Sequence, residues 1–145
     1  MEETENLFGE EHVRRYRETG GAVGHVWREG STVLLLTTTG RRSGEPRTTP
    51  LIYVEDGERY VIVASKGGAP EDPGWYRNLE KTPDVELQVG VEVFAARART
   101  VSGEERERLW RTANEVWPHY DDYARRTDRE IPVVVLERIE ALSST

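Results

Sequence analysis

The sequence contains no cysteine among its 145 residues. This absence excludes a disulfide framework, a thiolate nucleophile and a cysteine metal site, and it suits a reducing cytoplasm. No apolar run approaches the roughly 18 residues of a membrane span, and the first five residues are acidic where a signal peptide would be basic. Histidine is scarce, and His12, His25 and His119 lack metal-ligand spacing, so we expect no metal site.

Positive charge is in the minority: the formal net charge is −7, although 32% of the residues are charged. An acidic chain repels nucleic acid and anionic membranes unless its positive charge gathers locally. The broad basic stripe of a nucleic-acid-binding protein is absent, so we expect no nucleic-acid partner. We expect a cytoplasmic protein without an integral membrane segment, and peripheral contact with the inner face of the membrane stays open.

Hydrophobic periodicity predicts a mainly β chain of the α+β class. We expect strands at about 32–39, 49–55, 59–65, 85–89, 91–100 and 133–136, and helices at about 9–19, from Pro73 to about 81, from Ser102 to Pro118, and at about 120–126. The strand at 32–39 is almost uniformly β-branched and apolar, so it should be buried on both faces. The uniform hydrophobicity of 133–136 indicates a central position.

Three local signals mark the ends of these elements. Asp56-Gly57 lies between apolar runs and favours a tight hairpin turn. Asp72 and Pro73 form an N-cap and first-turn pair for a helix. The spacing of Ser102 and Glu105 is that of a capping box.

Most successive strands are joined by hairpins rather than by helices, which argues against a doubly wound sheet. We therefore predict a small closed or split antiparallel barrel of about six strands with peripheral helices. Residues 1–30 should form a helix and loop that pack on a single barrel domain at 31–145. The weak apolar face of that helix contains Leu7, Phe8, Val13 and Tyr16. Docking on the barrel is the expected role of this face, with a second subunit or a lipid surface as alternatives.

One loop between two strands gathers positive charge. Gly40-Arg41-Arg42-Ser43-Gly44 and the nearby Arg47 place three guanidinium groups in a short segment bounded by glycine. Arginine presents a planar donor fork suited to phosphate and carboxylate, and glycine lets backbone N–H groups approach the same anion. The alternative is a solvated hairpin tip. The spacing is not that of a P-loop.

A second loop, Ala64-Ser65-Lys66-Gly67-Gly68, also follows an apolar strand. Adjacent strand ends of a barrel could bring Lys66 near the first loop. Two such loops in an acidic chain favour a local anion site.

Aromatic residues gather in two further segments. Trp75 and Asn78 lie near the start of a helix, where an anion can bind and the ring can line a flat cofactor. The alternative is that Trp75 and Leu79 fill the core and that Asn78 caps or bridges loops. Tyr120 and Tyr123 share one helical face near Trp117, where they either point into a pocket or form a packed lid.

Taken together, these segments resemble the deazaflavin-dependent nitroreductase family, whose members use the reduced 5-deazaflavin coenzyme F420. The markers are GRRSGEPR at 40–47, TPL at 49–51, SKGG at 65–68, PGWYRNL at 73–79 and WPHYDDY at 117–123. The resemblance runs from about Val33 to Val135, and the joint occurrence of the markers in this order is highly specific. It implies a split β-barrel of the FMN-binding type.

The resemblance also implies a set of cofactor-binding residues. The phosphate and glutamyl tail would be held by Arg41, Arg42, Ser43, Arg47 and Lys66, with backbone contacts from Gly44 and from the strand ends at Leu36-Thr37 and Val63-Ala64. Pro50, Leu51 and Ile52 would line the deazaflavin ring, and Ser65, Gly67, Trp75 and Asn78 would complete the site.

The activity implied is hydride transfer from F420H2 to a quinone-like or nitroaromatic small-molecule acceptor. Ser65, Tyr120 and Tyr123 are the candidates for hydrogen bonds to the substrate or ring. Ile52 and Trp117 stand where nitroreductase members carry tyrosine, which weakens the expectation of activity on bulky nitro compounds. An oxidoreductase that binds FMN, and a non-catalytic protein that binds a cofactor, lipid or haem, are the alternatives. Both a monomer and a homodimer remain open.

Overall fold

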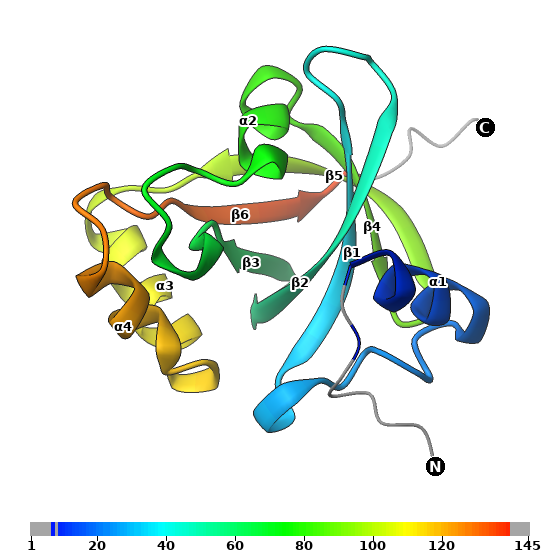
Figure 1. Ribbon diagram of the computed structural model, residues 1–145, viewed down its shortest axis with the longest axis horizontal. Coiled ribbons are helices and arrows are strands. Elements are labelled where there is room, and N and C mark those ends of the chain that lie inside the picture. Colours follow the sequence, from blue (N-terminus) through cyan, green and yellow to red (C-terminus); the bar gives the residue numbers. More distant parts are fainter. Residues whose placement is uncertain (1–6, 8, 140–145) are drawn as a thin grey trace.

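The computed structural model describes Leu7 and residues 9–139. Within this part of the chain, six strands close into one antiparallel barrel in the order β1-β2-β3-β6-β5-β4 (Figure 1). The strands are β1 (Thr32–Thr39), β2 (Pro46–Asp56), β3 (Arg59–Val63), β4 (Asp84–Val89), β5 (Glu92–Thr100) and β6 (Val133–Arg138). The α-helices are α1 (Gly9–Thr19), α2 (Gly74–Lys81), α3 (Gly103–Val116) and α4 (His119–Arg125), and the short 3₁₀ turns are η2 (Arg28–Gly30) and η3 (Lys66–Gly68). The predicted antiparallel barrel with peripheral helices is confirmed.

The first strand is buried on both faces, as its composition predicts. Leu34 and Leu36 point into the barrel interior, where they belong to the same core as Leu87. Val33 and Leu35 face the other way, under α1. The four apolar residues from Val33 to Leu36 fit this place because both faces of the strand are covered there.

The last strand closes the barrel between two strands that precede it in the sequence. Val63 of β3 pairs with Val133 of β6, and Leu136 of β6 pairs with Ala98 of β5. The four residues from Val133 to Leu136 are fully buried. The predicted central position of this strand is therefore confirmed.

Helix α1 packs on the outside of the barrel. Tyr16 is fully buried against Val33 and Leu35, with Val13 beside it. The Tyr16 hydroxyl also accepts a hydrogen bond of 2.7 Å from the backbone N–H of Gly90. Val13 and Tyr16 of α1 thus contact the barrel, while Phe8 lies outside the described residues.

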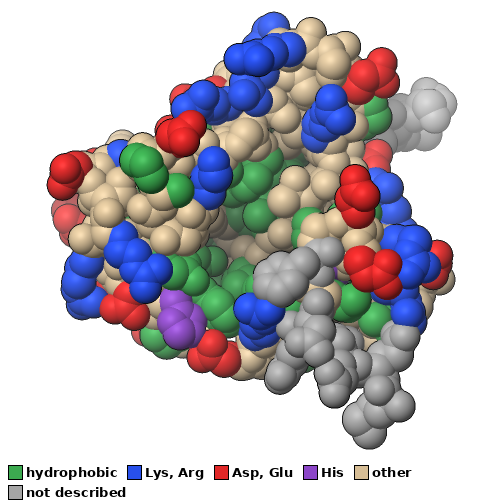
Figure 2. Space-filling view, in the orientation of Figure 1, with side chains coloured by type: hydrophobic (Ala, Val, Ile, Leu, Met, Phe, Trp, Pro, Cys, Tyr) green, Lys and Arg blue, Asp and Glu red, His purple; other side chains and the backbone are tan. Residues whose placement is uncertain are grey.

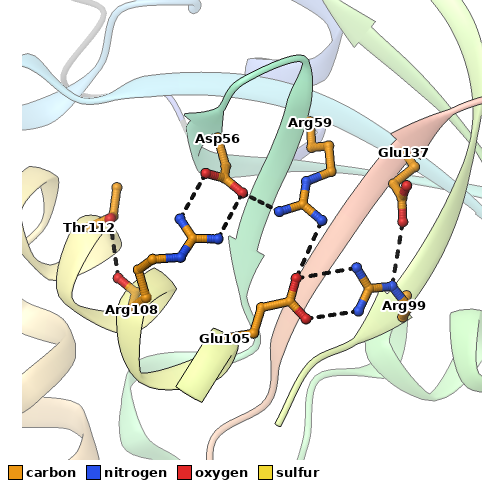
Figure 3. Close-up of polar contacts among 7 residues, drawn as sticks. All are labelled: Asp56, Arg59, Arg99, Glu105, Arg108, Thr112 and Glu137. Atoms are coloured by element: carbon orange, nitrogen blue, oxygen red, sulfur yellow. Dashed lines mark hydrogen bonds and ion pairs between the residues drawn. The ribbon is translucent and has the colours of Figure 1, made fainter. Parts of the chain in front are cut away.

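Helix α3 is fastened to the barrel by a network of ion pairs (Figure 3). Asp56, the last residue of β2, accepts hydrogen bonds from Arg108 and Arg59, and these two donors lower the pKa of its carboxyl group to about 2. Glu105 accepts from Arg59 and from Arg99 of β5. The network therefore fixes the position of α3, and with it the Trp117 segment at the end of the helix.

The prediction of a capping box at Ser102 and Glu105 is wrong, and this network explains why. Ser102 occupies the N-cap position of α3, but its side chain makes no capping hydrogen bond. The Glu105 carboxylate, which a capping box would turn back toward Ser102, is taken by two arginines instead. Charged hydrogen bonds to distant residues have displaced the local one.

The bounds of other elements differ from the prediction at their ends. Strand β2 begins at Pro46 rather than 49, and β3 ends at Val63 rather than 65. Helix α2 begins at Gly74, with Pro73 at the N-cap position and no side-chain cap. Asp72, the predicted N-cap, instead accepts a hydrogen bond of 2.9 Å from Arg129.

None of the helices in residues 9–139 is long and apolar enough to cross a membrane.

Candidate functional site

A cleft of about 480 Å³ opens on one side of the barrel. Figure 2 shows it as a central hollow with hydrophobic side chains on its floor and with Lys and Arg side chains gathered toward its upper rim. The cleft is lined by Trp27, Arg28, Pro50, Leu51, Ile52, Val63, Ser65, Lys66, Gly67, Pro73, Trp75, Trp117, Tyr120 and Tyr123. Strand β2, the second loop, the start of α2 and helix α4 therefore meet around one space.

The first basic loop forms the connection between β1 and β2, beside α2. A separate hollow of about 160 Å³ is lined there by Gly40, Arg41, Arg42, Ser43, Arg47 and Asn78. The Asn78 side-chain oxygen accepts hydrogen bonds from the Arg41 backbone N–H at 3.1 Å and from its guanidinium at 2.9 Å. The Asn78 amide nitrogen donates to Thr38 Oγ1 at 3.1 Å. Asn78 thus bridges the loop to the helix, as the alternative interpretation of this residue proposes.

Three cations of the two loops have no counter-charge in the described part of the chain. The side chains of Arg42, Arg47 and Lys66 make no hydrogen bond or ion pair with any described residue. Most other arginines in residues 9–139 are paired with a carboxylate or bonded to a carbonyl oxygen. Unpaired cations beside a hollow favour the binding of an anion.

The second loop is held in an uncommon backbone conformation. Lys66, Gly67 and Gly68 all have positive φ, at 46°, 63° and 84°. A Cβ atom on Gly68 would lie 2.7 Å from the carbonyl oxygen of Tyr123, so only glycine fits against α4 there. The neighbouring Ser65 is a largely buried residue that lines the cleft, and its hydroxyl makes no hydrogen bond to a described residue.

The aromatic end of the cleft comes from α4 and the residue before it. Tyr120 is 5% exposed, and its hydroxyl makes no hydrogen bond to a described residue although it borders the cleft. Burial raises the pKa of the Tyr120 phenol well above its usual value, so the hydroxyl stays a neutral donor. The Tyr123 hydroxyl accepts a hydrogen bond of 3.4 Å from Trp117 Nε1. Both tyrosines therefore point into the pocket rather than forming only a lid.

The position of α4 is itself fixed by one carboxylate. Asp121 accepts hydrogen bonds from Trp110 Nε1 at 2.7 Å and from the Asn114 amide at 2.9 Å. Both donors belong to α3. The ion pairs that hold α3 to the barrel therefore also hold Tyr120 in place.

Several lining residues were not predicted from the sequence. Trp27 and Arg28 reach the cleft from the loop that precedes β1, and Pro73 reaches it from the loop before α2. The Trp27 ring stacks on Trp117 with centroids 6.0 Å apart. Nothing local marks Trp27 as a site residue, because its partner lies far away in the sequence.

Some predicted site residues are not brought to the cleft. Leu36 and Thr37 lie inside β1 rather than at its end, and the strand is paired there with both β2 and β4. Neither residue lines the cleft, and the same holds for the fully buried Ala64 and for the exposed Gly44. Trp75 combines the two roles considered from the sequence: it lines the cleft, and it belongs to the same core cluster as Leu79.

The arrangement suits one kind of ligand. A cleft with apolar and aromatic walls can enclose a planar ring, and the unpaired cations in its lining and in the first basic loop can hold an anionic tail. No cluster of three or more His, Asp or Glu side chains that could bind a metal occurs in the described residues. Fold and site together define a barrel protein of the class that binds flavins or deazaflavins.

Comparison with known families makes the assignment specific. The family described as F420H(2)-dependent quinone reductase matches residues 8–138. The chain belongs to this family. The cofactor in the family description is the one that the resemblance of the sequence implies, and the basic loops and aromatic cleft contain suitable residues for it.

Individual relatives match most of this chain. The chain is 48% identical over 130 residues to an F420H(2)-dependent quinone reductase of Mycobacterium tuberculosis. The matched region covers 88% of this chain and 87% of that protein. It is 46% identical to the solved structure of an F420-H2 dependent reductase, with a TM-score of 0.68 and coverage of 72% and 93% of the two chains. A further solved relative, described as a domain-swapped dimer, is 42% identical, with a TM-score of 0.70 and coverage of 86% and 96%.

Proposed function

We propose that this protein reduces a quinone-like acceptor at the expense of F420H2, with both molecules held in the cleft between β2, the second loop and α4. The observation that supports this most strongly is the pair of hydroxyl groups of Ser65 and Tyr120. Both border the same cleft, and neither makes a hydrogen bond to a described residue. Because both hydroxyls face the cleft and have no bond to the described part of the chain, each can donate a hydrogen bond to a molecule bound there.

The cofactor's anionic end is assigned to the two basic loops. Arg42, Arg47 and Lys66 supply unpaired positive charge, and Ser43 lines the same hollow as the first two. Arg41 contributes as well, although Asn78 already holds its guanidinium. Arginine forks suit phosphate and carboxylate groups, which both occur in the cofactor's tail.

The ring is assigned to the apolar part of the cleft. Pro50, Leu51 and Ile52 of β2 form one wall, with Trp75 and Gly67 nearby. When bound there, the reduced deazaflavin supplies a hydride to an acceptor placed against it. The contribution of the protein is to position both molecules and to exclude water.

The hydroxyls of Ser65 and Tyr120 are assigned to the acceptor. A quinone that receives a hydride develops negative charge on oxygen, and a neutral hydroxyl can donate a hydrogen bond to it. The raised pKa of Tyr120 keeps its proton in place for this role. Solvent delivers the proton that completes the hydroquinone. Ile52 and Trp117 supply no phenol here, so we propose a quinone rather than a bulky nitro compound as the preferred acceptor.

The N-terminal segment is assigned to this site rather than to a membrane. Tyr16 is buried against the barrel, and Trp27 lines the cleft. We propose a protein of the cytoplasm that works without peripheral membrane contact through α1. On this proposal α1 and the loop that carries Trp27 form one structural unit with the barrel, since Trp27 and barrel residues line the same cleft.

A titration tests the proposal. Oxidised F420 and FMN are added separately to the protein, and binding is followed by the quenching of tryptophan fluorescence. We expect tight binding of F420 and no comparable binding of FMN. The reverse result would replace the proposal with an FMN enzyme.

Turnover and the two loops are tested next. Reduction of menadione in the presence of F420H2 is expected, and binding without turnover would indicate a carrier protein instead. Changing Arg41 and Lys66 together to alanine should weaken F420 binding by about a hundredfold, since two charged hydrogen bonds are lost. Arg125→Ala is the matched control, because Arg125 is exposed and, among residues 9–139, its side chain pairs only with Asp122. Unchanged affinity in the double variant would dismiss the two-loop site.

A further inference from the structure

One arginine holds the second loop from outside the cleft. Arg129 lies in the segment between α4 and β6 and is 14% exposed at its side chain. Its guanidinium donates hydrogen bonds to the carbonyl oxygens of Ala64 at 3.3 Å, Ser65 at 2.8 Å and Ala69 at 2.9 Å. It also pairs with Asp72 at 2.9 Å. One planar group thus joins the beginning of the loop, its end and the residue ahead of α2.

The conformation of the loop needs such support. Lys66 has a φ of 46°, a left-handed conformation in which a Cβ atom is disfavoured. Backbones of this kind persist only where their surroundings hold them. Two backbone hydrogen bonds close the loop internally, from Gly68 to Ser65 and from Ala69 to Lys66. Without Arg129, the carbonyl oxygens of Ala64 and Ala69 would lose this donor, and that of Ser65 would keep only the hydrogen bond from the Gly68 N–H.

The second loop contacts the cleft through some of its residues and Arg129 through its carbonyl groups. Ser65, Lys66 and Gly67 line the cleft, whereas Arg129 does not. The guanidinium therefore binds the carbonyl groups on the side away from the cleft. This arrangement leaves the Ser65 hydroxyl and the Lys66 ammonium group on the side where a ligand would bind.

We infer that Arg129 is a positioning residue, which fixes the second loop so that Ser65 and Lys66 face the cofactor site. The inference rests on the proposed function, because it assumes that Lys66 contacts the cofactor's anionic end. Arg129 itself touches neither cofactor nor acceptor. Its effect on binding is transmitted through the backbone of the loop.

A double-mutant cycle tests this role with the full-length protein. Affinity for oxidised F420 is measured by tryptophan quenching for the wild type, Lys66→Ala, Arg129→Lys and the variant with both changes. Lysine keeps the charge, but a single ammonium group cannot span the three carbonyl oxygens. We expect Arg129→Lys to weaken binding about tenfold in the wild-type background and less than about twofold in the Lys66→Ala background.

Rescue by a small cation separates positioning from loss of folding. Arg129→Ala, if folded, should bind F420 weakly, and millimolar guanidinium should restore part of its affinity. The same concentration should not improve binding by Lys66→Ala. Arg125→Ala is the control, because this exposed arginine bonds to Asp122 and to no other side chain in the described part of the protein. Thermal unfolding without ligand is recorded for each variant, so that affinities are compared only among folded proteins.

The outcomes separate the inference from the proposed function. Lys66→Ala with wild-type affinity would refute the role of Lys66 in the proposed site. If Lys66→Ala binds weakly while Arg129→Lys binds normally, the proposed site stands and the positioning role is overturned. The positioning role is also overturned if Arg129→Lys weakens F420 binding by the same factor with and without Lys66. Arg129 would then act independently of Lys66.

Discussion

Asn78 offers the sharpest test of how the first basic loop is organised. This side chain is 5% exposed and makes three hydrogen bonds, two to Arg41 and one to Thr38. Asn78→Ala leaves the buried Thr38 hydroxyl and the Arg41 N–H without these partners. A lost hydrogen bond contributes about 1 kcal/mol, and more where a charged group is involved. We therefore expect a loss of about 2 to 3 kcal/mol in the free energy of unfolding.

The loss should appear in both stability and binding. For a chain of this size, it corresponds to a fall of about 6 to 10 °C in Tm. The first loop would also lose its tie to α2, and affinity for F420 should fall about tenfold because binding must then order the loop. Urea unfolding without ligand measures the first effect, and fluorescence titration well below the Tm measures the second.

Thr38→Val is the matched control. It removes only the bond from the Asn78 amide nitrogen to Thr38 and leaves both bonds to Arg41. A stability loss of about 1 kcal/mol with affinity within about twofold of wild type is expected. If Asn78→Ala binds F420 as tightly as Thr38→Val does, then the bridge does not organise the loop for binding and the reasoning is refuted.

Three further predictions concern other parts of the molecule. Tyr120→Phe should lower kcat for menadione about tenfold with little change in F420 affinity, and an unchanged kcat would remove the phenol from the mechanism. Asp56→Asn should lower stability by about 1 kcal/mol at pH 7, after allowance for the partial exposure of this carboxylate. Since its pKa is about 2 in the folded state and 3.8 in the unfolded chain, the difference from wild type should shrink as pH falls from about 4 to 2, and urea titrations at several pH values would show whether it does. Gly68→Ala should lower stability by more than about 2 kcal/mol, because its Cβ would meet the Tyr123 carbonyl oxygen at 2.7 Å and its φ is 84°; thermal unfolding with wild-type Tm would contradict this.

The ion pairs on the outside of the barrel bear on the cleft indirectly. Asp56, Glu105 and their arginine partners hold α3 against the β2–β3 turn (Figure 3). Helix α3 in turn holds α4 through Asp121. The side of the cleft that carries Tyr120 thus depends on charged contacts outside the site.

The sequence by itself determined the local structure and the chemistry of the site. Composition placed the buried parts of two strands, because Val33–Leu36 of β1 and Val133–Leu136 of β6 are apolar on both faces and are buried in the structure. Glycine beside arginine in the first loop, and beside Lys66 in the second, predicted two loops able to bind an anion. The order of five short segments predicted the family, which the match to residues 8–138 confirms.

Tertiary structure alone decided which residues meet. Glu105 of α3 binds arginines of β3 and β5 instead of capping its own helix. Asp72 binds Arg129, and Trp27 stacks on Trp117. Each of these contacts joins residues that no local pattern connects, and each depends on the closure of the barrel. Residue type and spacing record short-range preferences, whereas a charged or aromatic side chain selects its partner only after the fold has brought distant segments within reach.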